Sequence, residues 1–217
     1  MKFIKKIAAL QDHRIMWILL FLIALALEQV AYQIFQKWLY MRPCEQCVYI
    51  RFSMVCLMIA GVIGAINAKS IVLKVIAYII AIYGTVKGIG FSLKLIKIGE
   101  AFRSGDPFGV QGCSSTPSFP FGLPLHEWFP STFLPTGDCG VDYPIVPEDA
   151  VLSSTQKYLV DLYKDGWYLI PSKHFMNMEQ STLLAFSTIL LAILMFLVCW
   201  IIVEVKKKGQ PKQEKEA

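Results

Sequence analysis

The sequence predicts an all-α membrane protein, a bundle of four transmembrane helices with a long loop between the third and fourth helices. Three observations favour this class. Hydrophobic residues make up 55% of the 217 residues and charged residues only 17%, whereas about 25% charged residues are typical of soluble domains. Four apolar runs are each long enough to cross a bilayer core of about 30 Å, which takes about 20 helical residues. Most lysines and arginines gather beside these runs.

The four apolar runs give the expected transmembrane helices. They cover Ile15–Phe35, Val48–Ile66, Ile71–Leu93 and Ser181–Val203. No small-residue cleavage site follows the first run, so we expect it to stay in the protein as a helix and not to act as a cleaved signal peptide. The remaining segments are an N-terminal arm, a first loop, a link, a second loop and a tail, at residues 1–14, 36–47, 67–70, 94–180 and 204–217.

The placement of the basic residues predicts the orientation of the bundle. Basic residues in the arm 1–14, the link 67–70 and the tail 204–217 place these segments in the cytoplasm by the positive-inside rule. The loop 94–180 has few basic residues for its length, so we expect it on the outer side of the membrane. The loop 36–47 is placed on the same side because successive helices cross the membrane in alternate directions. Because the net charge of +5 lies beside apolar runs, we expect no nucleic-acid partner.

Ionisable residues inside the apolar runs need a partner, a polar cavity or the membrane interface. Lys74 lies one turn from the cytoplasmic end of its run, so we expect its amine to extend to the interface. Arg51 lies one turn inside the outer end of its run, and the same explanation is open for it. Glu28 and Lys87 also fall inside runs.

The second loop is expected to lie close to the membrane as a lid. Gly99–Ser118 is rich in glycine and serine, which predicts coil. Prolines in Phe119–Pro135 oppose a regular helix, and its aromatic residues suit the membrane surface. Val151–Tyr163 has apolar residues at helical spacing, so we expect a helix that lies either on the bilayer or on the top of the bundle.

The positions of the six cysteines separate them into two groups. Cys56 and Cys199 fall inside apolar runs, where cysteine behaves as a small hydrophobic residue. The other four lie in the two outer loops, at Cys44, Cys47, Cys113 and Cys139. An even number of cysteines on an oxidising side of a membrane implies disulfides.

Cys44 and Cys47 form a Cys-x-x-Cys pair where the chain enters the second run. Such a pair closes a very small ring, so it is a poor structural staple, but it suits cycling between dithiol and disulfide. Cys47 directly precedes the expected helix, whose free N–H groups favour a thiolate. Arg51 follows four residues later on the same helical face. The pattern predicts a redox pair with a thiolate at Cys47 and Arg51 as its cation.

Three interpretations are open for Cys113 and Cys139. A structural zinc site usually uses two closely spaced cysteine pairs, and the chain has only one. A plain structural disulfide between Cys113 and Cys139 is the second. Glycines beside both residues favour the third, an exposed disulfide that is open to thiol exchange.

Two cysteine pairs on the outer side make an electron relay, which needs an electron donor and an electron acceptor, or sink. A thiol protein outside the membrane can supply the electrons. The sequence has no Gly-x-Gly-x-x-Gly motif for NAD or flavin and no Cys-x-x-Cys-His motif for haem. A lipid-soluble quinone is therefore the sink that we expect at a membrane-edge cysteine.

Several stretches carry a likeness to a known family: Pro43–Arg51 (PCEQCVYIR), Phe108–Cys113 (FGVQGC), Pro135–Gly140 (PTGDCG), and Gly166–Tyr168 (GWY) followed by His174–Met178 (HFMNM). In combination with the four apolar runs they resemble the DsbB family of bacterial disulfide-forming membrane proteins, and within it the DsbI branch. The resemblance covers nearly the whole chain. The loop after the last outer cysteine is larger than in the shorter family members.

This resemblance implies an activity and roles for five residues. The protein would be a thiol:quinone oxidoreductase of the bacterial inner membrane. It would reoxidise a periplasmic thioredoxin-fold dithiol oxidase of the DsbL or DsbA type and pass the electrons to ubiquinone or menaquinone. Cys113 would exchange with the partner and Cys139 would be its loop mate. Cys44 and Cys47 would receive the electrons, and Arg51 would hold the quinone oxygen or stabilise the thiolate.

A non-enzymatic tetraspan scaffold with structural loop disulfides is the alternative function. Such a scaffold has no use for a Cys-x-x-Cys pair beside Arg51. A transporter is less favoured, because the four helices lack repeat symmetry and have few carboxylates within the spans. Two roles are open for His126 and His174, a structural role or protonation of the quinone. The choice of quinone, the final substrates and the oligomeric state are also open.

Overall fold

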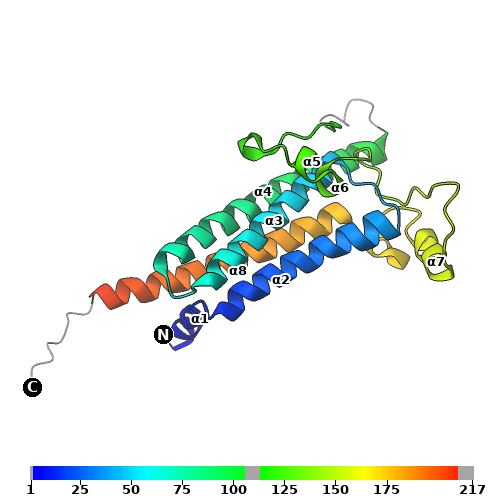
Figure 1. Ribbon diagram of the computed structural model, residues 1–217. Helices are drawn as coiled ribbons and strands as arrows, with labels where there is room; N and C mark the ends of the chain where they lie inside the picture. The colour runs from blue at the N-terminus through cyan, green and yellow to red at the C-terminus, as the bar shows by residue number, and fades with distance from the viewer. Residues whose placement is uncertain (1, 106–112, 210–217) are drawn as a thin grey trace, which may run out of the picture.

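The computed structural model describes residues 2–105 and 113–209. Part of the stretch Phe108–Cys113 and most of the tail 204–217 lie outside the described residues. Four long helices run side by side through the molecule (Figure 1), and each is long and apolar enough to cross a membrane. This confirms the predicted fold class. The first span joins α2 (Arg14–Gln29) to the π-helix η1 (Val30–Trp38), and the others are α3 (Glu45–Ile66), α4 (Ile71–Ser104) and α8 (Met178–Gly209).

Helix α3 begins at Glu45, before the Val48 at which the apolar run begins. The reason is a cap, because Cys44 has extended backbone angles and its Sγ accepts a hydrogen bond from the Cys47 N–H at 3.3 Å. A side chain that accepts from the third helical N–H satisfies one of the free donors at a helix start. Cys47 therefore lies inside the first turn instead of before it.

Helix α4 continues past Leu93 to Ser104. It ends at Gly105, whose φ of +70° is the left-handed conformation that commonly terminates helices and that glycine adopts without strain. The first part of the predicted coil Gly99–Ser118 is thus helical. This extension carries the end of α4 up beside the loops.

The helices pack in the order α2, α3, α4, α8, with α3 between α2 and α4. Small residues allow close approach, which is a usual device between membrane helices. At Gly64 a Cβ would overlap the ring of Trp17, and at Gly84 it would lie 2.7 Å from Cys56 Cβ. The close contact of α3 with both neighbours positions its N-terminal turn.

Lys74, whose amine the sequence analysis expected to extend to the interface, has an ion-pair partner in the protein. Its Nζ donates to Asp12 Oδ1 at 2.5 Å and lies 5.2 Å from the centre of the Trp200 ring. The acid that pairs with the amine follows α1 (Lys2–Leu10) in the chain. The contact joins the N-terminal part of the chain to α4 and α8.

The two ends of the bundle differ. Helix α1 and the C-terminal end of α8 lie at one end, and the loop elements gather at the other, which we name the loop end (Figure 1). There strands β1 and β2 pair antiparallel, with Tyr168 opposite Asn177, and β2 leads directly into α8. The short elements of the loop end are η2 (Pro120–Gly122), α5 (Leu125–Trp128), α6 (Pro130–Phe133), α7 (Ser154–Leu162), β1 (Tyr168–Ile170), η3 (Pro171–Lys173) and β2 (Phe175–Asn177).

Helix α7 falls within the predicted helical segment Val151–Tyr163. Ser153 and Gln156 form a reciprocal capping box at its start. Gln156 Nε2 also donates to the Trp38 carbonyl oxygen at 2.7 Å. Of the two positions left open by the sequence, this contact favours packing on the end of the bundle.

Candidate redox site

The Cys44–Cys47 pair, here named the inner pair, lies at the N-terminus of α3. The two Sγ atoms are 2.7 Å apart, and a disulfide bond is about 2.05 Å long, so the sulfurs are within reach of bond formation. The Cys44 residue is 3% exposed. The hydrogen bond with Cys47, and then burial, raise the pKa of the Cys44 thiol well above its usual value. The raised pKa favours the protonated form of Cys44, whose S–H can donate a hydrogen bond to Cys47 Sγ.

Cys113 and Cys139, here named the outer pair, are joined by a disulfide with Cα atoms 5.8 Å apart. Its two halves differ in exposure. Cys113 is exposed, whereas Cys139 is 2% exposed and lies in the same hydrophobic cluster as Cys44. The expectation of an exposed bond is thus correct for Cys113 and wrong for Cys139, because the loop that carries Cys139 packs onto the bundle.

Backbone hydrogen bonds hold the Cys139 loop beside the inner pair. The N–H groups of Thr136 and Gly137 both donate to the Pro43 carbonyl oxygen, at 3.0 and 3.1 Å. Pro43 directly precedes Cys44 in the chain. The two segments are therefore fixed to each other just before each buried cysteine.

The Cys113 side of the loop is held by Glu45, which lies between the two cysteines of the inner pair. Glu45 Oε2 accepts the Ser114 N–H at 2.9 Å, and Glu45 Oε1 accepts the Tyr49 hydroxyl at 2.9 Å. That hydroxyl in turn accepts the Ser118 N–H at 2.8 Å. The outer pair is thus tied to the start of α3 on both sides of its disulfide.

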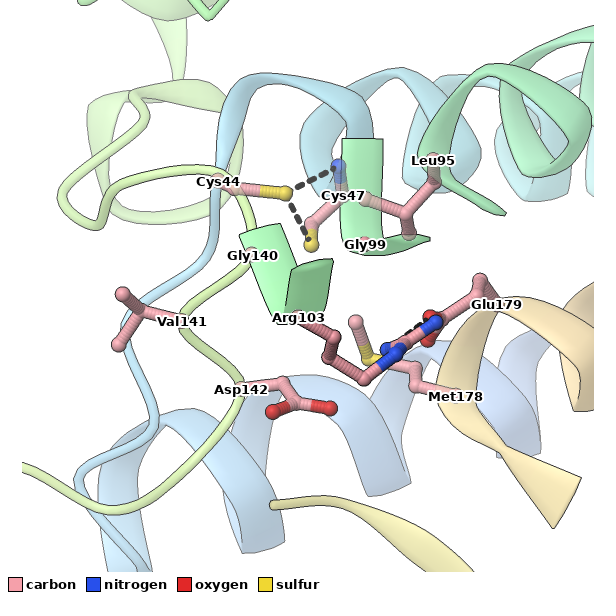
Figure 2. A pocket seen from close by; sticks show the side chains of 10 residues that line it. All are labelled: Cys44, Cys47, Leu95, Gly99, Arg103, Gly140, Val141, Asp142, Met178 and Glu179. Atoms are coloured by element: carbon pink, nitrogen blue, oxygen red, sulfur yellow. Dashed lines mark hydrogen bonds and ion pairs between the residues drawn. The ribbon is translucent and has the colours of Figure 1, made fainter. Parts of the chain in front are cut away.

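A small pocket reaches both sulfurs of the inner pair (Figure 2). Its volume of about 20 Å³ is enough for one water molecule. Its polar wall is formed by Arg103, Asp142 and Glu179, and Arg103 Nη1 donates to Glu179 Oε1 at 2.9 Å. The complete lining is Cys44, Cys47, Leu95, Gly99, Arg103, Gly140, Val141, Asp142, Met178 and Glu179.

Arg51 lies one turn after Cys47 and is 5% exposed. Its Nη1 donates to Gln36 Oε1 at 2.6 Å and to the Thr132 carbonyl oxygen at 3.0 Å, and its Nε lies 3.7 Å from Glu28 Oε1. Gln36 belongs to η1, and π-helical turns are rare and frequent at functional sites. The guanidinium is therefore buried among protein groups.

Glu28 supplies a buried carboxylate beside Arg51. The residue is 6% exposed, and neither of its carboxylate oxygens has a hydrogen-bond partner among the described residues. A buried polar atom without a hydrogen bond is costly, and in a native structure it points to strain or to a group that binds there. Arg51 and Glu28 together therefore offer a donor and an acceptor at the loop end of α2 and α3.

The two histidines left open by the sequence lie outside this pocket. His126 stacks on Phe119 with ring centroids 6.4 Å apart. His174 packs edge-on against Tyr168 at 4.9 Å in the hairpin. Across residues 2–105 and 113–209, no group of three or more His, Cys, Asp or Glu side chains is arranged to hold a metal ion.

Three polar residues of the pocket were not singled out from the sequence. Asp142 follows Cys139 closely in the chain, which is the one signal that could have found it. Arg103 and Glu179 had none, because they come from helices far apart in the sequence and meet only through the packing of α4 against α8.

Comparisons of the sequence with known proteins identify a family and several relatives. The family model for "Disulfide bond formation protein DsbB" matches residues 13–203. A relative from Campylobacter fetus is 52% identical over 199 residues, which cover 92% of this chain and 93% of the relative. "Protein-disulfide oxidoreductase DsbI" of Salmonella typhimurium is 52% identical over 195 residues, or 88% of this chain and 87% of that protein. The protein of the same name from Escherichia coli O1:K1 is 49% identical with the same coverage.

These matches confirm the family resemblance drawn from the sequence and the predicted enzyme class. They also remove the alternative of a non-enzymatic scaffold, because the matched relatives are named as oxidoreductases. The matched residues include all four long helices and both cysteine pairs. The chain therefore belongs to the DsbB family, as a protein-disulfide oxidoreductase that spans the membrane four times.

Proposed function

We propose that this chain reoxidises a periplasmic thioredoxin-fold dithiol oxidase of the DsbL or DsbA type and passes the electrons to a membrane quinone, either ubiquinone or menaquinone. It acts in the bacterial inner membrane, with both termini in the cytoplasm. One observation carries the proposal. A disulfide with one exposed and one buried sulfur is tied directly beside a second, membrane-edge cysteine pair.

The exposure of Cys113 supports its proposed role as the residue that meets the partner. A partner thiolate attacks Cys113 Sγ, the Cys113–Cys139 bond breaks, and the electron pair leaves on Cys139. The second partner thiol then releases Cys113 from the mixed disulfide. The partner dithiol has become a disulfide, and the outer pair has become a dithiol.

The burial of Cys139 beside the inner pair supports its proposed role as the residue that exchanges with that pair. The Cys139 thiolate attacks Cys44 Sγ of the Cys44–Cys47 disulfide, and Cys47 leaves as a thiolate. Cys113 then attacks Cys139 and releases Cys44. The outer pair is again a disulfide and the inner pair a dithiol, which is the arrangement of bonds that the structure holds.

The residues beside the inner pair fit a quinone. A quinone takes up two electrons and two protons and leaves as a quinol. Arg51 can donate to a quinone oxygen, and the carboxylate of Glu28, which accepts no hydrogen bond from the described residues, can accept from a hydroxyl. Arg51 favours the thiolate at Cys47, and its hydrogen bond to an oxygen strengthens as that oxygen gains negative charge.

Serine substitutions of the inner pair test the proposal. Cys44→Ser and Cys47→Ser are expected to abolish quinone reduction by a reduced DsbA-type partner while the protein still inserts into the membrane. Cys56→Ser, a change of a buried cysteine in the same helix, is the matched control and is expected to retain turnover. Retained turnover in either inner-pair variant would contradict the assignment.

A further inference from the structure

The pocket beside the inner pair contains a carboxylate that the route described above does not use. Asp142 and both sulfurs line the same cavity of about 20 Å³ (Figure 2). Burial, and then the nearby Glu179 carboxylate, raise the pKa of Asp142 to about 6. A group that titrates close to neutral pH is suited to both give and take a proton.

Charged and polar groups from several elements surround Asp142. Arg103 of α4 and Glu179 of α8 face it, and the Trp167 N–H donates a hydrogen bond to it. Arg103 is already paired with Glu179 Oε1, which also accepts from Asn177 Nδ2 at 2.9 Å. The guanidinium of Arg103 is thus paired with Glu179, and Asp142 is the pocket carboxylate whose pKa is raised.

The inner pair needs such a group. Cys44 holds its proton in the dithiol, as its raised pKa shows. That proton must leave each time the Cys44–Cys47 disulfide forms and must return each time the disulfide is reduced. Cys44 is buried, so the proton needs a route out. Cys44 and Asp142 line the same pocket, which has room for one water molecule.

We propose that Asp142 is the proton acceptor of the inner pair. As the disulfide forms, the Cys44 S–H bond breaks, its proton passes through the water-sized cavity to an Asp142 carboxylate oxygen, and the S–S bond to Cys47 forms. The electron pair leaves to the oxidant, and the same carboxyl returns the proton when the inner pair is reduced. The inference rests on the proposed function in one respect, the assignment of Cys44 and Cys47 as the inner redox pair.

The test uses diamide, a small oxidant that takes two electrons and two protons from a dithiol, so neither quinone nor partner protein is required. The fully reduced, quinone-extracted protein is treated with diamide from about pH 5 to about pH 8, across the pKa of about 6, and the Cys44–Cys47 disulfide is quantified by mass spectrometry. The rate of formation should rise as the pH passes about 6, because only the carboxylate form of Asp142 accepts a proton.

Asp142→Asn should lose this inflection and react at least roughly tenfold more slowly above it, whereas Asp142→Glu should restore the inflection. Asp138→Asn is the matched control, because Asp138 is an exposed acid on the other side of Cys139. It should keep the wild-type profile.

A wild-type rate and inflection in Asp142→Asn would overturn the role of Asp142. If that variant fails to fold, a wild-type profile without an inflection near pH 6 would overturn it equally. A wild-type protein that forms no Cys44–Cys47 disulfide with diamide would overturn the assignment of the inner pair, and the proposal with it.

Discussion

Arg51 is held by three protein groups, and this decides how its substitution should be tested. Its contacts with Gln36 and Thr132 join α3 to η1 and to α6, so its loss has a structural cost as well as a chemical one. Its proximity to Glu28 and its place one turn after Cys47 are the features on which its proposed contact with a quinone rests. A kinetic measurement that separates quinone use from folding distinguishes the two contributions.

Arg51→Leu should raise the quinone KM and lower kcat, because hydrogen bonds to charged groups contribute about 1.5–3 kcal/mol. Roughly tenfold to a hundredfold loss in kcat/KM is expected on that scale. Arg51→Lys keeps the charge but loses the planar fork of donors, so its loss should be smaller. The measurement is steady-state kinetics with quinone varied at saturating partner.

Gln36→Leu provides the control for the structural part of this effect. It removes one contact of Arg51 and leaves the guanidinium in place. Its unfolding temperature should fall in parallel with that of Arg51→Leu, but its quinone KM should change much less. An unchanged quinone KM and kcat in Arg51→Leu would show that Arg51 only connects α3 to neighbouring elements and takes no part in quinone reduction.

At the scale of elements, the decisive arrangement is the docking of the second loop on the first turn of α3. The loop that carries Cys139 approaches the first loop so closely at Gly137 that a Cβ there would lie 2.6 Å from the Arg42 carbonyl oxygen. The Arg42 carbonyl belongs to the backbone, which cannot move aside as a flexible side chain can. Any larger residue at this position must therefore lift the loop and move Cys139 away from Cys44.

Gly137→Val should slow electron transfer from the outer to the inner pair by roughly tenfold or more, because small displacements of reacting groups carry large kinetic costs. Quinone reduction by a pre-reduced inner pair should remain close to wild type. Gly90→Ala is the control, since a Cβ there meets nothing within 4 Å. Rapid chemical quenching with thiol alkylation measures both steps. A wild-type transfer rate in Gly137→Val would contradict the docked arrangement.

The sequence predicts the presence of the four long helices better than the residues at which they begin and end, and better than the contacts between them. Apolar runs indicate the four helices because lipid or protein surrounds each of them on all sides. The extension of α4 to Ser104 is not visible in the same way, since beyond Leu93 the helix carries charged residues outside the apolar run. The N-cap at Cys44 also escapes the sequence, because a sulfur is an unusual cap.

The candidate redox site also combines features that the sequence indicates with features that only the folded structure reveals. The spacing of Cys44 and Cys47 and the position of Arg51 are local features, so the sequence can indicate them. The pocket around Asp142 joins side chains from α4, α8 and the loop, and only tertiary packing brings them together. The burial of Cys139 is also a tertiary effect, which its glycine neighbours do not reveal.

At the scale of the whole molecule, the bundle separates a terminal end from a loop end that holds both cysteine pairs (Figure 1). This separation suits a protein that meets a soluble thiol partner on one side of the membrane. The exposed half of the outer pair is the place where such a partner can reach a sulfur without unfolding the loop.

A partner lacking its second active-site cysteine should form a trapped, reducible adduct with this protein at Cys113. The adduct should disappear in Cys113→Ser and persist in Cys199→Ser, whose buried cysteine lies within α8. Non-reducing electrophoresis followed by peptide mapping detects it. Trapping that survives the loss of Cys113 would move the point of exchange elsewhere in the chain.

The central claim is that the inner pair gives its electrons to a quinone, and a stoichiometric measurement tests it most directly. Quinone-extracted, fully reduced protein is mixed with a short-chain ubiquinone or menaquinone analogue while the quinone absorbance and the alkylation state of Cys44 and Cys47 are followed together. We predict one Cys44–Cys47 disulfide for each quinone reduced. Oxidised quinone that persists beside free Cys44 and Cys47 thiols, with both analogues, would contradict the account.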